Sequence, residues 1–167
     1  MKFHLVDRIV SIEPGKRIVT TKSLSLAEEY LADHFPAFPV LPGVLMIEAM
    51  VQAAAWLVRI EQDFANSIVV LGGARNVRYA SFVQPGKTLR CELTAKDIGR
   101  SDSRFQGAGF VEEVLAVSAR LELRSFNLAE RQPYLADADA KIVAGLMEQF
   151  RLIGGPEALE SAGGAGQ

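Results

Sequence analysis

The alternation of apolar and polar residues predicts a chain built mainly from strands. Apolar and β-branched residues fill positions 3–12 and 17–21, and the turn signal Glu13-Pro14-Gly15-Lys16 between them predicts an N-terminal hairpin. Alternation is strictest over Val117–Arg124, which places one face on a core and the other in water, as in an antiparallel sheet. Further strands are expected over residues 67–71, before a turn at Gly72-Gly73, and over 87–98, 103–110 and 114–126.

One long helix is expected from Gly43 to about Asp63. This segment is rich in good helix formers, contains no internal glycine or proline, and follows Pro42, whose fixed φ suits a helix start. Between Val44 and Val58 it is apolar on nearly every face, so we expect other structure to wrap around it. The pattern therefore indicates an α+β domain in which one antiparallel sheet curls around a central helix.

The periodicity changes after the last strand. We expect the sheet and its helix to occupy residues 1–126, and a C-terminal helical extension to occupy 127–153, with the helix itself over 136–153. A shorter turn or two of helix is expected within 26–35. Residues 154–167 are rich in glycine and alanine and are expected to form a flexible tail.

Composition excludes several classes of function for this chain of 167 residues. With 18 Lys+Arg against 20 Asp+Glu there is no global positive field, so we expect no nucleic-acid binding. The start of the chain lacks a secretory signal, and the apolar run Val44–Val58 is too short and too polar for a membrane span. A single cysteine, Cys91, and two histidines argue against a disulfide or a metal site and fit a cytoplasmic protein.

Candidate chemistry is concentrated around a proline-rich loop and the start of the long helix. Pro36, Pro39 and Pro42 stiffen this loop, which carries His34, a side chain suited to accept a proton near neutral pH. Glu48 lies in the second turn of the apolar helix, where burial disfavours the charged form and would let it act as an acid. Gln52, one turn further on the same face, is placed to orient Glu48 by a hydrogen bond.

The helix start adds a third element to this chemistry. The backbone N–H groups of Gly43 and Val44 and the positive end of the helix dipole suit an oxygen that gains negative charge. A base, an acid and an oxyanion site form the minimum set for proton abstraction next to a carbonyl. Simpler structural explanations stand beside this one: His34 as a core residue, Glu48 paired with an arginine, and the prolines as a stiff connector.

The run H-F-P-x-x-P-x-x-P-G-V-L-x-x-E-A-x-x-Q over residues 34–52 resembles the signature of the FabZ-type β-hydroxyacyl-acyl carrier protein dehydratases. Weaker similarities extend the resemblance to about residues 5–125. They comprise Leu5-Val6-Asp7-Arg8, Arg78-Tyr79 with Pro85-Gly86, and Arg104-Phe105 with Gly107. The resemblance implies a hot-dog fold, and an enzyme that dehydrates a thioester on acyl carrier protein without metal or cofactor.

The resemblance also implies roles for individual residues. His34 and Glu48 match the family's catalytic histidine and acid, and the Gly43 amide, with Val44 beside it, matches the oxyanion site. The family forms homodimers, often assembled as trimers of dimers, in which His comes from one chain and Glu from the other. Phe38, Tyr79 and Phe82 are candidates for lining the acyl tunnel because they lie near the motif.

A basic stretch offers a candidate surface for the acidic carrier protein. Between residues 75 and 104 there are seven Lys or Arg against three acids. Alternating charges on the solvent-exposed face of a sheet are the commoner explanation for such a stretch. The candidates for carrier-protein contact are Arg75, Arg78, Lys87, Arg100 and Arg104.

Two alternative functions stay open from the sequence. One is an acyl thioesterase on the same fold, in which a carboxylate activates water against the thioester carbonyl. The other is a non-catalytic hot-dog subunit that binds acyl chains or stabilises a partner. Two departures from the family pattern keep this last alternative open: Asp33 replaces the glycine that usually precedes the histidine, and Phe38 stands where the family more often has a small or charged residue.

Overall fold

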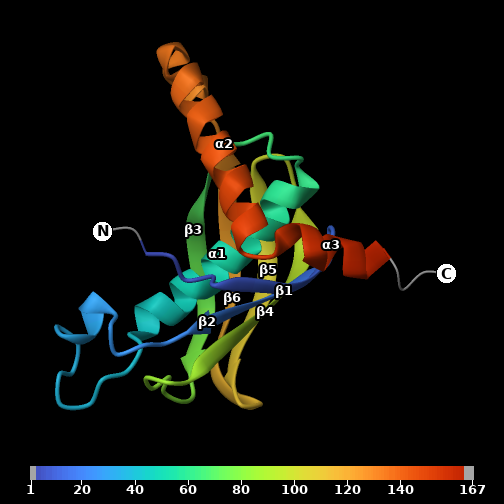
Figure 1. The fold of residues 1–167 in the computed structure, drawn as a ribbon. Helices are drawn as coiled ribbons and strands as arrows, with labels where there is room; N and C mark the ends of the chain where they lie inside the picture. The colour runs from blue at the N-terminus through green and yellow to red at the C-terminus, as the bar shows by residue number, and fades with distance from the viewer. Residues whose placement is uncertain (1–2, 164–167) are drawn as a thin grey trace.

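The computed structural model describes residues 3–163, with side chains as far as Ser161, and forms one curved sheet around one helix (Figure 1). The sheet is antiparallel throughout, with the strand order β1-β2-β4-β5-β6-β3. The predicted N-terminal hairpin is confirmed, because β1 and β2 pair on either side of the Pro14-Gly15 turn. The strands are β1 (Arg8–Glu13), β2 (Arg17–Ser23), β3 (Ile68–Tyr79), β4 (Thr88–Ile98), β5 (Asp102–Val111) and β6 (Val114–Phe126).

The predicted central helix is confirmed as α1 (Gly43–Glu61). The concave face of the sheet packs on it through buried side chains such as Leu93, Phe105 and Leu121. By length and composition alone α1 would also qualify as a membrane span, but 56% of its most apolar window is buried inside the protein. This arrangement is the hot-dog fold that the sequence predicted.

The turn predicted at Gly72-Gly73 is wrong. β3 continues through both glycines to Tyr79, and the register against β6 shifts between Leu71 and Gly73 and again between Arg75 and Arg78. In each shift β3 has one residue more than β6, which is the arrangement of a β-bulge. Asn76, with a φ of +52°, lies within the second shift. The two glycines therefore mark an irregularity in a long strand, for which the local sequence signal is the same as for a turn.

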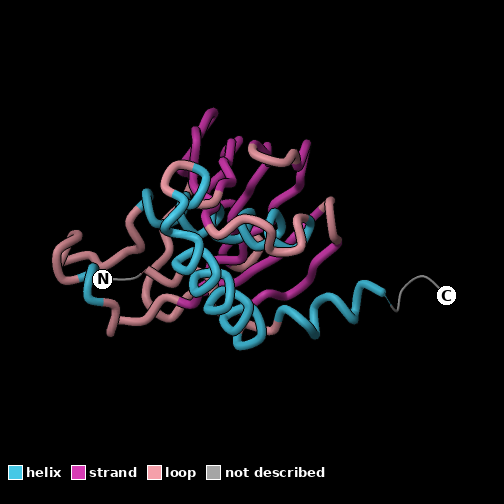
Figure 2. Tube along the Cα trace, turned by 90° about the horizontal axis from the view of Figure 1, so that it is seen from above, coloured by secondary structure: helices cyan, strands magenta, loops and turns pink. Residues whose placement is uncertain are grey.

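The C-terminal extension folds back onto the domain. The chain passes through short 3-10 turns η2 (Leu128–Glu130) and η3 (Pro133–Leu135) into α2 (Ala136–Leu152), as predicted. Phe150 of α2 is 8% exposed and packs on Trp56 and Phe64, with ring centroids 5.8 and 6.0 Å apart. Figure 2 shows α2 as a long rod and the following helix extending away from it toward the C-terminus.

The prediction of a flexible tail is wrong for residues 155–163, which form the helix α3 (Gly155–Gly163). Gly154, with a φ of +82°, follows the end of α2 and redirects the chain, so that α3 packs along β1 and Ala158 is only 4% exposed. A tertiary contact thus supports a helix that composition did not predict. Residues 164–167 of the predicted tail lie outside the described residues.

The two edges of the sheet differ. At the β1 edge, the amide of Ile9 donates a hydrogen bond to the carbonyl of Ile153 at 2.8 Å, and α3 lies alongside. At the β3 edge, no element of the described chain covers the strand, and its exposed side chains include large apolar ones. These are Val70 (43% exposed), Leu71 (40%), Val77 (40%) and Tyr79 (51%).

Candidate active site

The His34 loop is irregular and contains turns, one of them closed by a 2.8 Å hydrogen bond from the Phe38 amide to the Phe35 carbonyl. The short helix expected within 26–35 is reduced to a 3-10 turn, η1 (Glu29–Leu31). The residue before this turn, Glu28, is held by the buried side chain of Lys22, whose Nζ donates to Glu28 Oε1 at 2.8 Å. His34 is half-buried, and its ring lies 4.6 Å, centroid to centroid, from that of Phe35. The φ of Phe35 is +48°, an uncommon conformation that this loop imposes directly after His34.

The N-terminus of α1 offers backbone donors. Pro42 occupies the N-cap position, and no side chain caps the helix. The Leu45 and Met46 amides donate to the Pro42 carbonyl, whereas residues 3–163 provide no backbone acceptor for the amides of Gly43 and Val44. These two N–H groups, at the positive end of the helix dipole, have the arrangement expected of an oxyanion site.

Tyr79 explains why residue 43 is a glycine. A Cβ at Gly43 would lie 2.9 Å from Cε1 of the Tyr79 ring, closer than ordinary packing allows. The end of β3 and the start of α1 therefore meet at this point. Tyr79, one of the three predicted tunnel residues, is thus placed beside the predicted oxyanion site.

The other two predicted tunnel residues, Phe38 and Phe82, contact each other. Their rings pack edge to face with centroids 5.7 Å apart, and both are substantially exposed. The amide of Leu41 donates to the carbonyl of Val83 at 2.9 Å and holds the two segments together. These aromatic residues form an apolar surface on the loops next to the helix start.

Glu48 and Gln52 interact as their spacing predicted. Gln52 Nε2 donates to Glu48 Oε1 at 3.0 Å and to the Phe3 carbonyl at 2.9 Å, and its Oε1 accepts from the Leu5 amide at 2.9 Å. The Gln52 amide is therefore fixed by the N-terminal segment, which crosses α1 at this point. This network holds the half-buried Glu48 carboxyl in one orientation.

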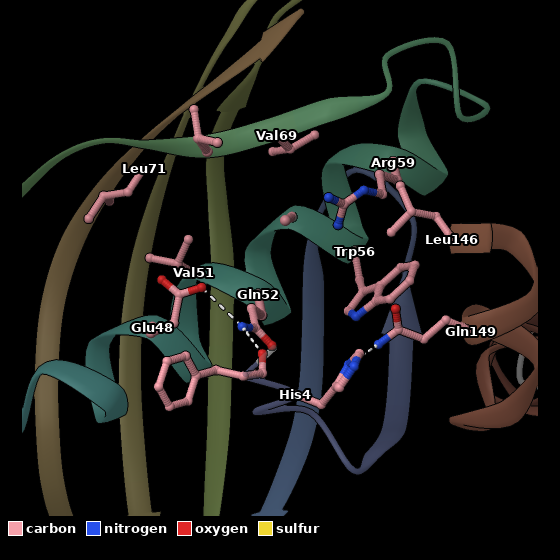
Figure 3. Close-up of a pocket in the computed structure, with 13 residues that line it drawn as sticks. His4, Glu48, Val51, Gln52, Trp56, Arg59, Val69, Leu71, Leu146 and Gln149 are labelled. Carbon is pink, nitrogen blue, oxygen red and sulfur yellow. Dashed lines mark hydrogen bonds between the residues drawn. The ribbon is translucent and has the colours of Figure 1, made fainter. Parts of the chain in front are cut away.

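Glu48 lies at one end of a groove of about 470 Å³ that follows one face of α1 (Figure 3). The helix contributes side chains spaced by three and four residues, β3 forms one wall, and the N-terminal segment and α2 form the other. Most of the lining between the ends is apolar. The residues of this groove are Phe3, His4, Glu48, Val51, Gln52, Ala55, Trp56, Arg59, Val69, Val70, Leu71, Leu146 and Gln149.

Arg59, at the other end of the groove, was not predicted as a site residue. Its guanidinium lies 5.1 Å from the centre of the Trp56 ring. Within the described part of the chain its Nε has no hydrogen-bond partner, and it takes part in no ion pair. Burial lowers the pKa of Arg59 to about 10, so the side chain stays charged at neutral pH. The sequence signal that could have placed Arg59 in the groove is its spacing: eleven residues after Glu48 corresponds to about three helical turns and therefore to the same face of the helix.

His34 does not line this groove in its own chain. Among residues 3–163, those that surround Glu48 come from α1, β3, α2 and the N-terminal segment. One protomer therefore brings Glu48 into contact with Gln52, and Gly43 into contact with Tyr79. It does not bring His34, the predicted base, to Glu48, the predicted acid.

Of the five predicted carrier-protein residues, Arg75 and Arg104 line one hollow on the sheet, whereas Arg78, Lys87 and Arg100 lie outside it. Arg75, Lys87 and Arg104 are each within 4 Å of an acidic side chain, namely Glu122, Glu112 and Asp97 respectively. Arg100 lies beside the C-terminal end of α1, where its carbonyl accepts from Gln62. Arg78 directly precedes Tyr79 and is exposed at the helix-start end of the sheet, so it lies nearest the oxyanion site.

Cys91 is a core residue of β4, and burial raises the pKa of its thiol to about 12. In the part of the chain that the structure describes, no three His, Cys, Asp or Glu side chains are grouped as metal ligands would be. The polar and charged side chains that line the groove are His4, Glu48, Gln52, Arg59 and Gln149, and the backbone donors of Gly43 and Val44 lie at the start of the same helix.

Solved structures with this fold include both dehydratases and thioesterases. The ApeI:P dehydratase heterocomplex from Xenorhabdus doucetiae matches with a TM-score of 0.65 at 21% identity, over 80% of this chain and 90% of that one. A thioesterase from Haemophilus influenzae matches with a TM-score of 0.55 at 20% identity, over 73% and 80% of the two chains. At such identities these similarities establish the fold alone.

Sequence comparisons are more specific. Residues 1–120 match the model of the FabA-like domain family. A protein of Pelotomaculum thermopropionicum named 3-hydroxyacyl-[acyl-carrier-protein] dehydratase FabZ is 40% identical over 119 residues, covering 71% of this chain and 85% of that protein. A protein of the same name from Symbiobacterium thermophilum is 34% identical over 131 residues, covering 78% and 92%. The chain belongs to the FabZ-type 3-hydroxyacyl-[acyl-carrier-protein] dehydratases, within the FabA-like domain family.

Proposed function

We propose that this protein removes water from a 3-hydroxyacyl thioester on acyl carrier protein and forms the trans-2-enoyl thioester. In this reaction neutral His34 takes the proton from C2 of the acyl chain, and the Gly43 amide stabilises the negative charge on the thioester oxygen. Glu48 gives its proton to the departing hydroxyl group, which leaves as water. Val44 offers a second amide beside that of Gly43.

The observation that carries this proposal is the fixed Glu48 carboxyl next to an uncapped helix start. Gln52 holds Glu48 by a 3.0 Å hydrogen bond, and five residues of helix, about 8 Å of axial rise, separate Glu48 from the Gly43 amide. The Glu48 side chain leans toward the start of its own helix, so its carboxyl lies nearer the Gly43 amide than the two backbones do, as the neighbouring hydroxyl and carbonyl oxygens of a β-hydroxyacyl unit require. The apolar groove that continues beyond Glu48 suits the rest of an acyl chain.

A homodimer accounts for the separation of His34 from Glu48. The β3 edge is open, its exposed side chains are apolar, and it runs along the groove that contains Glu48. An unprotected apolar edge strand is a surface for pairing with another chain. A second copy paired at β3 would bring its His34 loop toward this groove, as the resemblance to the family implies. The same proposal includes the assembly of three such dimers into a trimer of dimers.

Single substitutions test the chemistry. With crotonyl thioester the reverse reaction, hydration, is followed by the loss of enoyl absorbance. His34→Ala and Glu48→Gln should each lower turnover at least about a hundredfold. Near-normal turnover in either folded variant would refute the assignment. Release of free thiol without an enoyl or hydroxyacyl product would identify a thioesterase instead, and no turnover in the wild type would identify a non-catalytic subunit.

Mixing the two inactive variants tests whether the site is shared. If His34 and Glu48 act across the interface, each mixed dimer contains one intact site and one doubly substituted site. After unfolding and refolding together, an equal mixture should therefore recover about a quarter of the wild-type turnover. If both residues act within one chain, every site keeps one substitution and mixing recovers nothing.

We also place the reaction in the cytoplasm, because the thiol of Cys91 is free and buried, which fits a reducing compartment. Acyl carrier protein is the proposed thioester carrier, with Arg78 as its contact nearest the helix start. A coenzyme A thioester of the same acyl chain provides the comparison substrate.

A further inference from the structure

Arg59 is a charged side chain, without a carboxylate partner in the described part of the chain, at the far end of the groove that begins at Glu48. It lies eleven residues after Glu48 on the same face of α1, which corresponds to about 16 Å along the helix axis. Both residues line the same groove (Figure 3). A chain bound at Glu48 and extended along this face would therefore end at the guanidinium.

The walls between these two residues are suited to an alkyl chain. Val51, Ala55 and Trp56 form the helix side, and Val69 and Leu71 of β3 face them. Beyond them, Leu146 of α2 closes the end of the groove at Arg59. A chain in this groove thus meets apolar side chains along its length and a positive charge at its end.

The guanidinium of Arg59 has no carboxylate partner within the described residues. Its Nε has no hydrogen-bond partner, and its close neighbour is the ring of Trp56 at 5.1 Å. Arg59 is half-buried, and its Nε is buried without a partner among those residues, so covering the guanidinium with a methyl group would remove more of its remaining hydration at a cost in free energy. A carboxylate at the same place would form charge-assisted hydrogen bonds with it.

We propose that Arg59 determines substrate specificity by selecting acyl chains whose far end carries a carboxylate over methyl-ended chains of the same length. The inference rests on the proposed dehydratase function, since it assumes that the thioester lies at Glu48. α2 takes part because Leu146 and Gln149 form the wall at this end, and Gln149 is held there by its 3.0 Å hydrogen bond to His4. The extension after the sheet therefore closes the binding groove as well as covering the core.

The test compares pairs of enoyl thioesters of equal length, one methyl-ended and one ending in a carboxylate, over a series of chain lengths. At the length that reaches Arg59, the wild type should show at least about a tenfold higher kcat/KM for the carboxylate-ended member. Arg59→Met keeps the bulk but removes the charge, and should abolish or invert this ratio. Arg59→Lys should retain part of it, and the surface variant Arg131→Met should keep the wild-type ratio.

Two results would overturn the inference: a wild-type preference for methyl-ended chains at every length, or a ratio in Arg59→Met within twofold of the wild type. Calorimetric binding of the same thioesters to the wild type and to Arg59→Met gives a second readout that does not need turnover. Hydration of crotonyl thioester by the wild type tests the dehydratase chemistry separately. Failure of the proposed function is thereby distinguished from failure of the specificity inference.

Discussion

Replacement of Gln52 by leucine tests the network that orients Glu48. The side-chain amide of Gln52 makes three hydrogen bonds, to the Leu5 amide, the Phe3 carbonyl and the Glu48 carboxyl, at 2.9, 2.9 and 3.0 Å. Leucine has a similar volume and can make none of them. Gln52→Leu therefore leaves two backbone groups without their partner and lets the carboxyl rotate.

The expected cost follows from these three contacts. An unsatisfied, partly buried polar group costs about 1–3 kcal/mol, and access of water from the groove reduces this, so we expect the free energy of unfolding to fall by about 2–3 kcal/mol. For the reaction, a misplaced acid should lower kcat at least about tenfold, with a smaller change in KM, because the acyl chain still fits the groove.

Urea denaturation and crotonyl thioester hydration measure the two effects. Gln132→Leu is the control, since Gln132 is exposed, lies outside the groove and accepts one exposed hydrogen bond, from Tyr134 Oη. We expect the control to change the free energy of unfolding by less than about 1 kcal/mol and kcat by less than about twofold. If Gln52→Leu behaves like this control, Gln52 does not position Glu48.

Three further predictions concern two residues of α2 and the proposed contact of Arg78 with acyl carrier protein. Burial alone raises the pKa of Asp139, but hydrogen bonds from Ser67 Oγ and the amides of Ala129 and Leu128 lower it overall. The ionised Asp139 therefore stabilises the fold above about pH 4, and this stabilisation is lost as pH falls through the lower folded-state pKa. In an acid titration, the free energy of unfolding should fall more steeply in the wild type than in Asp139→Asn. Phe150→Ala should lower the free energy of unfolding by about 3 kcal/mol in urea, whereas Met147→Ala, 42% exposed on the same helix, should cost less than about 1 kcal/mol; equal effects would contradict the packing argument. Arg78→Glu should raise KM for the carrier-protein thioester several-fold but not for the coenzyme A thioester, and Arg100→Glu, at the opposite end of the sheet, should change neither.

Local signals in the sequence predicted most of the fold. The hairpin, α1 and the Glu48–Gln52 contact each depend on residues within a few positions of one another, so their patterns are visible without a structure. The Gly72-Gly73 bulge was misassigned because a glycine pair has the same local signature in a turn and in a bulged edge strand.

Long-range contacts account for what the sequence did not predict. The segment that fixes Gln52 lies 47 to 49 residues away along the chain, at Leu5 and Phe3. α3 forms where composition predicted none because Ala158 packs against β1. The unpaired state of Arg59 follows from which side chains surround it in space, which no spacing rule provides.

The different treatment of the two sheet edges limits how far the sheet can grow. At the β1 edge, the amide of Ile9 already donates to the carbonyl of Ile153, and α3 lies where another strand would have to approach. Among the described strands β3 keeps a free edge, and the proposed pairing of two copies there about a twofold axis would use the free edge of both. Edge-to-edge addition would then stop at two chains rather than propagate into a fibre, so the C-terminal extension would make an exposed apolar strand compatible with the proposed closed dimer.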